Sequence, residues 1–316
     1  MKKILLFDTS ICTENLGDYL IMESLKLELR NIFQNDFFIH VPTHDKLWKN
    51  SFEQIKKSDF LFVCGTNLLS SNMNSYNQWK INLFDSLFLK NIILMGVGWW
   101  QYQKKPNIYT KKLLNKILHR GYLHSVRDNY TLNKLKSIGI KNVINTGCPT
   151  LWHLTKKHCE SIPTKKAENV LFTFTNYNQN YNLDLKLFEI LKRNYRKLYF
   201  WPQSFDDLKY ANEISKKNII LINPNLKALD EILDSNIDLD YVGTRLHSGI
   251  RAMQFKRRTI IIGIDNRAIE LSKDSYITLI KRDEIDFLTE KINSNFETKI
   301  SLPCKHIEKW KKQFIV

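Results

Sequence analysis

The sequence lacks the motifs that mark several common classes of protein. Its 316 residues include five cysteines, an odd number, and no C-x-x-C pair. Neither a disulfide framework nor a zinc site is therefore indicated. No Walker loop occurs, and the first strand-to-helix turn lacks the G-x-G-x-x-G fingerprint, so nicotinamide binding has no support. We also find no cluster of metal-ligating residues and expect neither a metal nor a cofactor.

Long apolar runs are absent as well. The run that follows Met1 ends at Asp8, which is too short for the core of a signal peptide. The run Ile92–Trp100 is far too short to span a bilayer. Because the cysteine pattern favours reduced thiols, we expect a soluble protein of the cytoplasm. Peripheral contact with the inner face of the membrane stays open.

Basic residues are in excess. The chain has 48 Lys and Arg against 32 Asp and Glu, a formal net charge of +16. This excess favours an anionic partner, although a lysine-rich soluble surface explains it equally well. The basic residues are spread along the whole chain and form no arm or tail. We therefore expect no nucleic-acid partner.

Apolar, strand-like runs alternate with helical patterns almost throughout. Continuously apolar runs such as 60–63 and 92–95 are typical of parallel strands covered on both faces. The polar stretch Leu154–Glu168 breaks this rhythm and predicts an interdomain linker. We expect an α/β protein with two doubly wound, Rossmann-like domains that face a cleft, at residues 1–160 and 161–300.

The pattern predicts two further helices of interest. The spacing in the first half predicts a helix over Tyr76–Phe88. Residues 301–316 predict a basic amphipathic helix, which either packs back across the domains or lies on a membrane surface. We favour packing.

Polar residues and glycines follow the apolar strands of the first half, where doubly wound sheets bind ligands. The polar loop after the third strand could hydrogen-bond sugar hydroxyls, or it could be an ordinary turn. The tryptophan pair after the fourth strand suits stacking on a sugar ring, although at least one of the two could belong to the core. The candidate ligand-binding residues are Asn15, Gly17, Asp18, Gly65, Thr66, Asn67, Gly98 and Trp99.

Arg127 ends the fifth strand, and Asp128 follows it. The planar fork of an arginine at this edge suits a carboxylate or phosphate ligand. The alternative is that Arg127 and Asp128 engage each other.

The most informative run is 240–251, DYVGTRLHSGIR. The strand stops at Gly243 and a helix starts near Arg245, so the exposed amides of the helix form an anion site. His247 lies in the first turn, and Arg251 lies one turn further on the same face. Ser248 is a further candidate. After the next strand, Asp265 and Asn266 either face the ligand or cap the following helix.

These elements, in this order, resemble the polysaccharide pyruvyl transferase family. The matching segments are 15–18 (NLGD), 59–65 (DFLFVCG), 96–98 (GVG), 126–128 (VRD) and 244–248 (TRLHS). The resemblance implies a fold like the two-domain GT-B glycosyltransferases. It also implies transfer of pyruvate from phosphoenolpyruvate onto two hydroxyls of a sugar in a cell-surface polysaccharide or its precursor, as a cyclic ketal.

In the family, two arginines and a histidine surround phosphoenolpyruvate, and those roles fall here on Arg127, Arg245 and His247. The first domain would take a free or lipid-linked sugar acceptor, and the second would take the donor. Three segments depart from the family pattern: 65–67 (GTN), 148–149 (CP) and 266–267 (NR). These departures concern the acceptor more than the donor.

Two other functions remain open. One is a nucleotide-sugar-dependent glycosyltransferase on the same architecture, because a fold does not fix a chemistry. The other is a non-catalytic protein that binds an anionic polymer or lipid through its positive charge.

Overall fold

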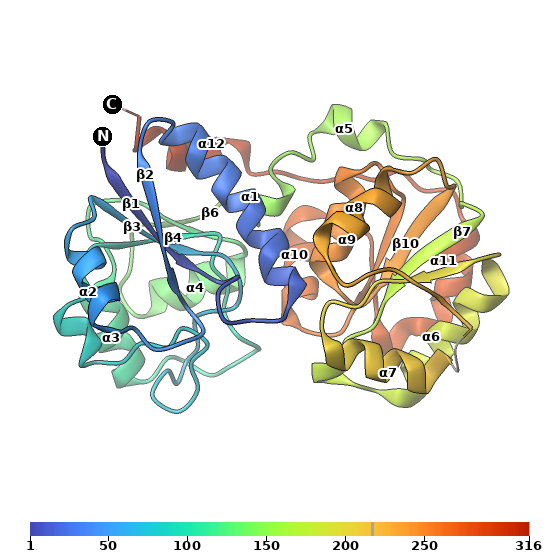
Figure 1. The fold of residues 1–316 in the computed structure, drawn as a ribbon, viewed down its shortest axis with the longest axis horizontal. Coiled ribbons are helices and arrows are strands. Elements are labelled where there is room, and N and C mark those ends of the chain that lie inside the picture. Colours follow the sequence, from blue (N-terminus) through green and yellow to red (C-terminus); the bar gives the residue numbers. More distant parts are fainter. Residues whose placement is uncertain (216–217, 316) are drawn as a thin grey trace. The chain divides into compact units, whose positions relative to one another are not determined.

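The computed structural model describes residues 1–215 and 218–315 (Figure 1). Contacts divide the chain into two units. Unit 1 comprises Met1–Thr13, Ile21–Pro149 and Leu302–Val316, and unit 2 comprises Glu14–Leu20 and Thr150–Ser301. Neither unit is a single stretch of chain.

Unit 1 is built on a parallel sheet in the order β2-β1-β3-β4, beside a two-stranded parallel sheet, β5-β6. A bridge between Val97 and Val126 and a hydrogen bond from the Leu94 amide to His124 Nδ1 (3.2 Å) connect β4 with β5. The strands are β1 (Lys3–Asp8), β2 (Phe37–Pro42), β3 (Phe60–Cys64), β4 (Ile92–Met95), β5 (His124–Val126) and β6 (Val143–Asn145).

Two helices of unit 1 begin at residues whose side chains cap them. Asn107 caps α3 and Asp128 caps α4 through their side chains. Helix α1 starts in a segment of unit 2 and continues in unit 1. The helices are α1 (Leu16–Ile32), α2 (Lys49–Lys56), α3 (Ile108–Ile117), α4 (Asn129–Ser137), α12 (Cys304–Lys312) and the short 3-10 helix η1 (Asp85–Leu87).

The carboxyl-terminal helix α12 packs within unit 1. Trp310 is fully buried, and its ring lies 6.1 Å from that of Phe62. Phe314, just after the helix, lies 5.3 Å from the same Phe62 ring. The apolar face of α12 is therefore covered by residues of unit 1.

Unit 2 is a six-stranded parallel sheet in the order β12-β11-β10-β7-β8-β9. The chain first runs outward from β7 through β8 to β9, and then returns to the other side of β7 with β10. The strand order thus reverses between β7 and β10, where doubly wound folds bind ligands at the carboxyl ends. The strands are β7 (Asn169–Thr173), β8 (Leu198–Phe200), β9 (Ile220–Leu221), β10 (Leu239–Gly243), β11 (Thr259–Gly263) and β12 (Leu279–Lys281).

A helix follows each strand of unit 2, and one further α-helix precedes β7. The helices are α5 (Lys156–Glu160), α6 (Tyr181–Asn194), α7 (Phe205–Ser215), α8 (Leu226–Asp234), α9 (Leu246–Gln254), α10 (Asn266–Ser275) and α11 (Leu288–Asn293), with the 3-10 helices η2 (Pro149–Leu151), η3 (Asn176–Asn178) and η4 (Arg282–Phe287). No helix in the described ranges is long and apolar enough to cross a membrane.

Two segment predictions were wrong. The predicted helix Tyr76–Phe88 is a loop that contains only η1, because asparagine side chains bond its backbone locally. Asn82 Oδ1, for example, accepts the amides of residues 84 and 85 at 2.7 and 3.1 Å. The predicted linker Leu154–Glu168 contains α5 and buries Leu154 and Ile162, so this segment is part of unit 2.

Candidate functional site

The residue Arg245 lies at the reversal of strand order in unit 2. It precedes α9, and its backbone is fixed by a closed ring of hydrogen bonds. Its amide donates to Thr173 Oγ1 (3.2 Å), Thr173 lies 2.7 Å from the Tyr241 hydroxyl, and Tyr241 donates to the Arg245 carbonyl (2.8 Å). Burial raises the pKa of Tyr241 and keeps its phenol protonated. The start of α9 is therefore held on the ends of β7 and β10.

The guanidinium of Arg245 is paired with Asp207, the third residue of α7. Arg245 Nη2 lies 2.5 and 2.6 Å from the two carboxylate oxygens, and Nε lies 2.9 Å from Oδ2. The Asp207 side chain is fully buried and that of Arg245 is 6% exposed. A pair this deeply buried costs desolvation, so its geometry must be good to be tolerated.

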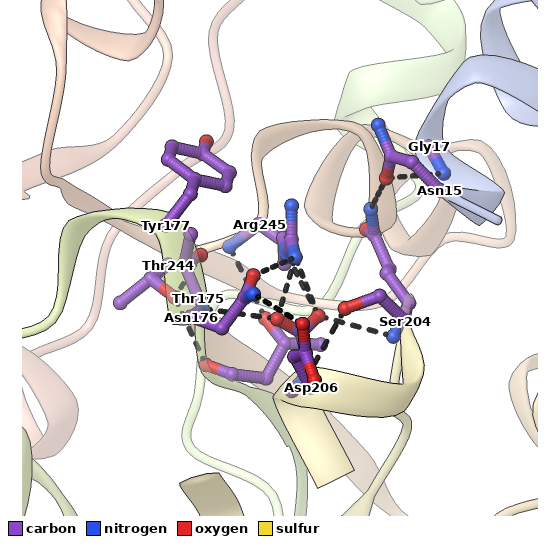
Figure 2. Close-up of polar contacts among 12 residues, drawn as sticks. Asn15, Gly17, Thr175, Asn176, Tyr177, Ser204, Asp206, Thr244 and Arg245 are labelled. Carbon is purple, nitrogen blue, oxygen red and sulfur yellow. Dashed lines mark hydrogen bonds and ion pairs between the residues drawn. The ribbon is translucent and has the colours of Figure 1, made fainter. Parts of the chain in front are cut away.

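Three neighbouring residues also contact this ion pair. The amide of Asn176 donates to Asp207 Oδ1 (3.0 Å), and the amide of Gln203 donates to Oδ2 (3.3 Å). The Arg245 guanidinium also lies 5.0 Å from the ring centroid of Tyr177. Figure 2 shows the acidic and amide groups gathered on one side of Arg245.

One terminal nitrogen of Arg245 remains outside these contacts. Within the described residues, the bonds of its guanidinium use only Nε and Nη2, and Figure 2 shows the other terminal nitrogen directed away from the carboxylates. The side chain of Arg245, the residue that precedes α9, makes no cap hydrogen bond to the helix. A guanidinium donor beside the amino end of a helix is a suitable anion site.

His247 is the second residue of α9 and is 7% exposed. Ser248 is fully buried and donates to Gln203 Oε1. The Gln203 amide nitrogen in turn donates to Asn15 Oδ1 (3.1 Å), and the Leu16 amide donates to the Gln203 carbonyl (3.0 Å). Gln203 therefore connects the predicted motif at residues 15–18 with α9 inside unit 2.

Gly17 allows this connection. A Cβ atom at Gly17 would lie 2.6 Å from Gln203 Nε2, so only glycine leaves room for the amide. The Gly17 amide donates to Asn15 Oδ1 (3.2 Å), and Asn15 Nδ2 donates to Asp18 Oδ2 (3.0 Å). Asp18 is 5% exposed, in the first turn of α1.

The remaining candidates of unit 2 are in ion pairs or caps. Arg251 forms a two-pronged pair with Asp230 of α8, at 2.7 and 2.5 Å. Asp265 caps α10, as the alternative to ligand binding predicted, and also pairs with Arg267 at 2.6 Å. Asn266 is the buried first residue of α10.

In unit 1, Arg127 is 1% exposed and lies against Gly98. Its Nε donates to Asp128 Oδ2 (3.3 Å), and its Nη2 donates to Asn67 Oδ1. A Cβ atom at residue 98 would lie 2.5 Å from the guanidinium, so glycine is required beside it. Asp128 also caps α4, accepting the Thr131 amide at 2.7 Å.

The other candidates of unit 1 lie in its interior. Gly65 and Thr66 are buried and both have φ in the left-handed region. Trp99 is fully buried, and its ring nitrogen donates to Gln103 Oε1 (3.0 Å), so it is the core member of the tryptophan pair. The neighbouring Trp100 is partly exposed and stacks on Tyr76, with ring centroids 3.9 Å apart.

Sequence reasoning missed Asp207, Asn176 and Gln203. Gln203 follows the end of β8, Asp207 lies in the first turn of the next helix, and Asn176 follows β7. The rule that ligand-binding residues follow the carboxyl ends of strands, which found Arg245, therefore applies to this region as well. The pattern Ser204-x-x-Asp207 also marks a helix start, where Ser204 Oγ accepts the Asp207 amide at 3.2 Å. In the described part of the chain, no group of three or more His, Cys, Asp or Glu could hold a metal ion.

Comparison with protein families decides the relationship. The model of the family described as polysaccharide pyruvyl transferase matches residues 15–266. The chain belongs to this family. The match spans the candidate site residues of this pyruvyl transferase family member from Asn15 to Asn266.

Solved structures similar to this pyruvyl transferase family member share its fold. A UDP-GlcNAc 2-epimerase from Methanocaldococcus jannaschii, in complex with UDP-GlcNAc and UDP, has a TM-score of 0.56 at 13% identity, over 96% of this chain and 95% of that one. Another structure of the enzyme from that organism has a TM-score of 0.52 at 14% identity, with the same coverage. The expected α/β class with two Rossmann-like, GT-B-type domains is confirmed. A comparison with curated proteins finds no match.

Proposed function

We propose that the chain transfers the pyruvyl group of phosphoenolpyruvate to two hydroxyls of a sugar in a polysaccharide or its precursor. The product is a cyclic ketal, and inorganic phosphate is released. Family membership supports a pyruvyl transferase. One observation carries the donor proposal: the unused donor edge of Arg245 lies beside the amino end of α9, at the strand reversal of unit 2.

Phosphoenolpyruvate is a small anion with a carboxylate and a phosphate. The α9 amides and Arg245 Nη1 would donate hydrogen bonds to one of these groups. Asp207 holds the guanidinium in one orientation, so little rotamer freedom is lost on binding. Arg127, held by Asn67 and Asp128, is the candidate for the second anionic group.

The reaction needs one proton donor. A first sugar hydroxyl adds to C2 of the enol while C3 takes a proton, and the C2–O bond to phosphate then breaks. The second hydroxyl adds to C2 and closes the ketal. Of the two protons that the hydroxyls lose, one replaces the proton given to C3 and the other leaves with the phosphate. In this proposal His247 supplies the proton to C3 and regains one from a hydroxyl, since an imidazole exchanges protons near neutral pH.

The acceptor sugar would stack on the Tyr76–Trp100 pair rather than on Trp99. Tyr76 is 40% exposed, whereas Trp99 is fully buried. Trp100 follows the carboxyl end of β4, the edge at which ligands of such sheets bind. Aromatic faces suit the apolar face of a sugar ring.

The test is to incubate the protein with phosphoenolpyruvate and candidate glycans, and to measure phosphate release together with the mass of the glycan. We expect a mass gain of one pyruvyl ketal, lost in His247→Ala and in Arg245→Lys. Arg193→Lys, an exposed arginine of α6, is the matched control and should keep full activity. Transfer from a nucleotide sugar instead would establish a glycosyltransferase, and near-normal phosphate release by His247→Ala would reject the role of that histidine.

A further inference from the structure

A groove of about 690 Å³ opens on unit 1, beside the amino ends of β3 and β4. The carboxyl ends of the strands, which the candidate residues of unit 1 such as Arg127 follow, lie at the opposite edge of the sheet. Its apolar lining includes Phe52 and Ile55 of α2, together with Leu61, Leu87 and Phe88. The groove is therefore separate from the candidate catalytic residues of the same unit.

Large apolar side chains around this groove are unusually exposed. Phe84 is 69% exposed, Leu87 54% and Phe88 57%. They are clustered: the Phe88 ring lies 5.5 Å from that of Phe52 and 5.9 Å from that of Phe84. A single exposed apolar residue needs no explanation, but a contiguous group marks an interaction surface. We call Phe52, Phe84, Leu87 and Phe88 the aromatic patch.

Lysines border the aromatic patch. Lys49 and Lys56, at the two ends of α2, and Lys90, before β4, line the groove and are exposed. Two carboxylates, Glu53 and Asp59, line it as well, and Asp59 Oδ2 accepts the Lys3 amide at 2.7 Å. The lysines outnumber the carboxylates on a chain whose formal net charge is +16.

We propose that the aromatic patch and its lysines bind the surface of an anionic lipid bilayer. Aromatic and leucine side chains enter the headgroup boundary while lysines beside them contact anionic headgroups. A second copy of the chain fits less well, because it would bring the same lysines and the same net positive charge against this face. Helix α12, the other basic amphipathic element, buries its apolar face within unit 1.

Vesicle sedimentation of the full chain, without any substrate, tests this proposal and does not depend on the proposed function. We expect binding to phosphatidylcholine vesicles that contain phosphatidylglycerol, and little binding to phosphatidylcholine alone. The double change Leu87→Ser and Phe88→Ser should lower the partition coefficient about tenfold or more, from the loss of buried apolar area. The triple change of Lys49, Lys56 and Lys90 to Gln should lower it by a similar factor and remove its salt dependence.

Matched controls distinguish the patch from general exposure and charge. Phe287→Ser removes an exposed ring (64% exposed) from unit 2, and the triple change of Lys156, Lys157 and Lys165 to Gln removes the same charge there. Both controls should bind vesicles as the parent does. Equal loss of binding in the controls, or no preference for anionic lipid, would overturn the proposal. So would a dimer in light scattering that Phe88→Ser dissociates, because the patch would then be an interface between copies.

Discussion

The buried histidine His124 makes the stability of unit 1 depend on pH in a calculable way. Its Nδ1 accepts the Leu94 amide at 3.2 Å, and its Nε2 lies 3.0 Å from the His119 carbonyl. The neutral ring with its hydrogen on Nε2 satisfies both contacts. Protonation would place a second hydrogen on Nδ1, against the Leu94 amide, and burial lowers the pKa of His124 from 6.5 to about 4.

The sign of the effect depends on which state binds the proton. In the unfolded chain His124 titrates near its ordinary pKa, so between that value and about 4 only the unfolded state binds the proton. The stabilisation is complete above pH 6.5 and is lost as the pH falls toward 4. The difference between 6.5 and about 4 corresponds to about 3 kcal/mol of unfolding free energy.

Urea unfolding across this pH range, followed by tryptophan fluorescence, measures the effect. We expect His124→Gln to be less stable than the parent at neutral pH, but to lose less stability on acidification. Burial also lowers the pKa of His119, so part of the acid dependence should persist in that variant. His158→Gln, a histidine of unit 2 whose Nε2 lies 2.8 Å from the Met253 carbonyl, is the control. An unchanged acid dependence in His124→Gln would refute the reasoning.

Three further substitutions test the surroundings of Arg245 and Arg127 and the core of unit 1. Asp207→Asn leaves the Arg245 guanidinium buried without its carboxylate, and should cost about 3–5 kcal/mol in urea unfolding as well as activity; unchanged stability would contradict the buried pair. Gly98→Ala pushes on Arg127, and should lower kcat/KM for phosphoenolpyruvate up to about a hundredfold; an unaltered value would remove Arg127 from donor binding. Trp99→Ala should cost about 3–5 kcal/mol of stability, since this ring is core, and a change in acceptor KM alone would show instead that the ring contacts sugar.

The strand-end rule predicted Arg245 and Arg127 correctly as residues that follow strands, because continuously apolar runs locate parallel strands reliably. The sequence offered Asp128 as an alternative partner of Arg127, but it predicted neither Asp207 nor Asn67 as a partner. Asp207 lies 38 residues before Arg245 along the chain, and Asn67 lies 60 residues before Arg127. Pairing across such separations is decided by which strands become neighbours, and local patterns carry no information on this.

The Tyr76–Phe88 segment failed for a different reason. Its apolar spacing fits a helix, but asparagines and a serine offer its backbone other partners, such as Ser70 Oγ donating to the Tyr76 carbonyl at 2.7 Å. These local side-chain hydrogen bonds therefore outweigh the helix propensity of the segment. The same segment contributes η1 and part of the aromatic patch. The wrong helix prediction therefore missed an exposed apolar surface as well as a loop.

The division of the chain affects how the protein can be made. The polypeptide passes between the units four times, after residues 13, 20, 149 and 301. A ribosome therefore releases the last segment of unit 1 only after all of unit 2 has been made, and until then the site on β3 that receives Trp310 and Phe314 stays uncovered. Cutting the gene at residue 150 would yield two fragments that each lack part of their own core, and the halves should be prepared by co-expression or circular permutation instead.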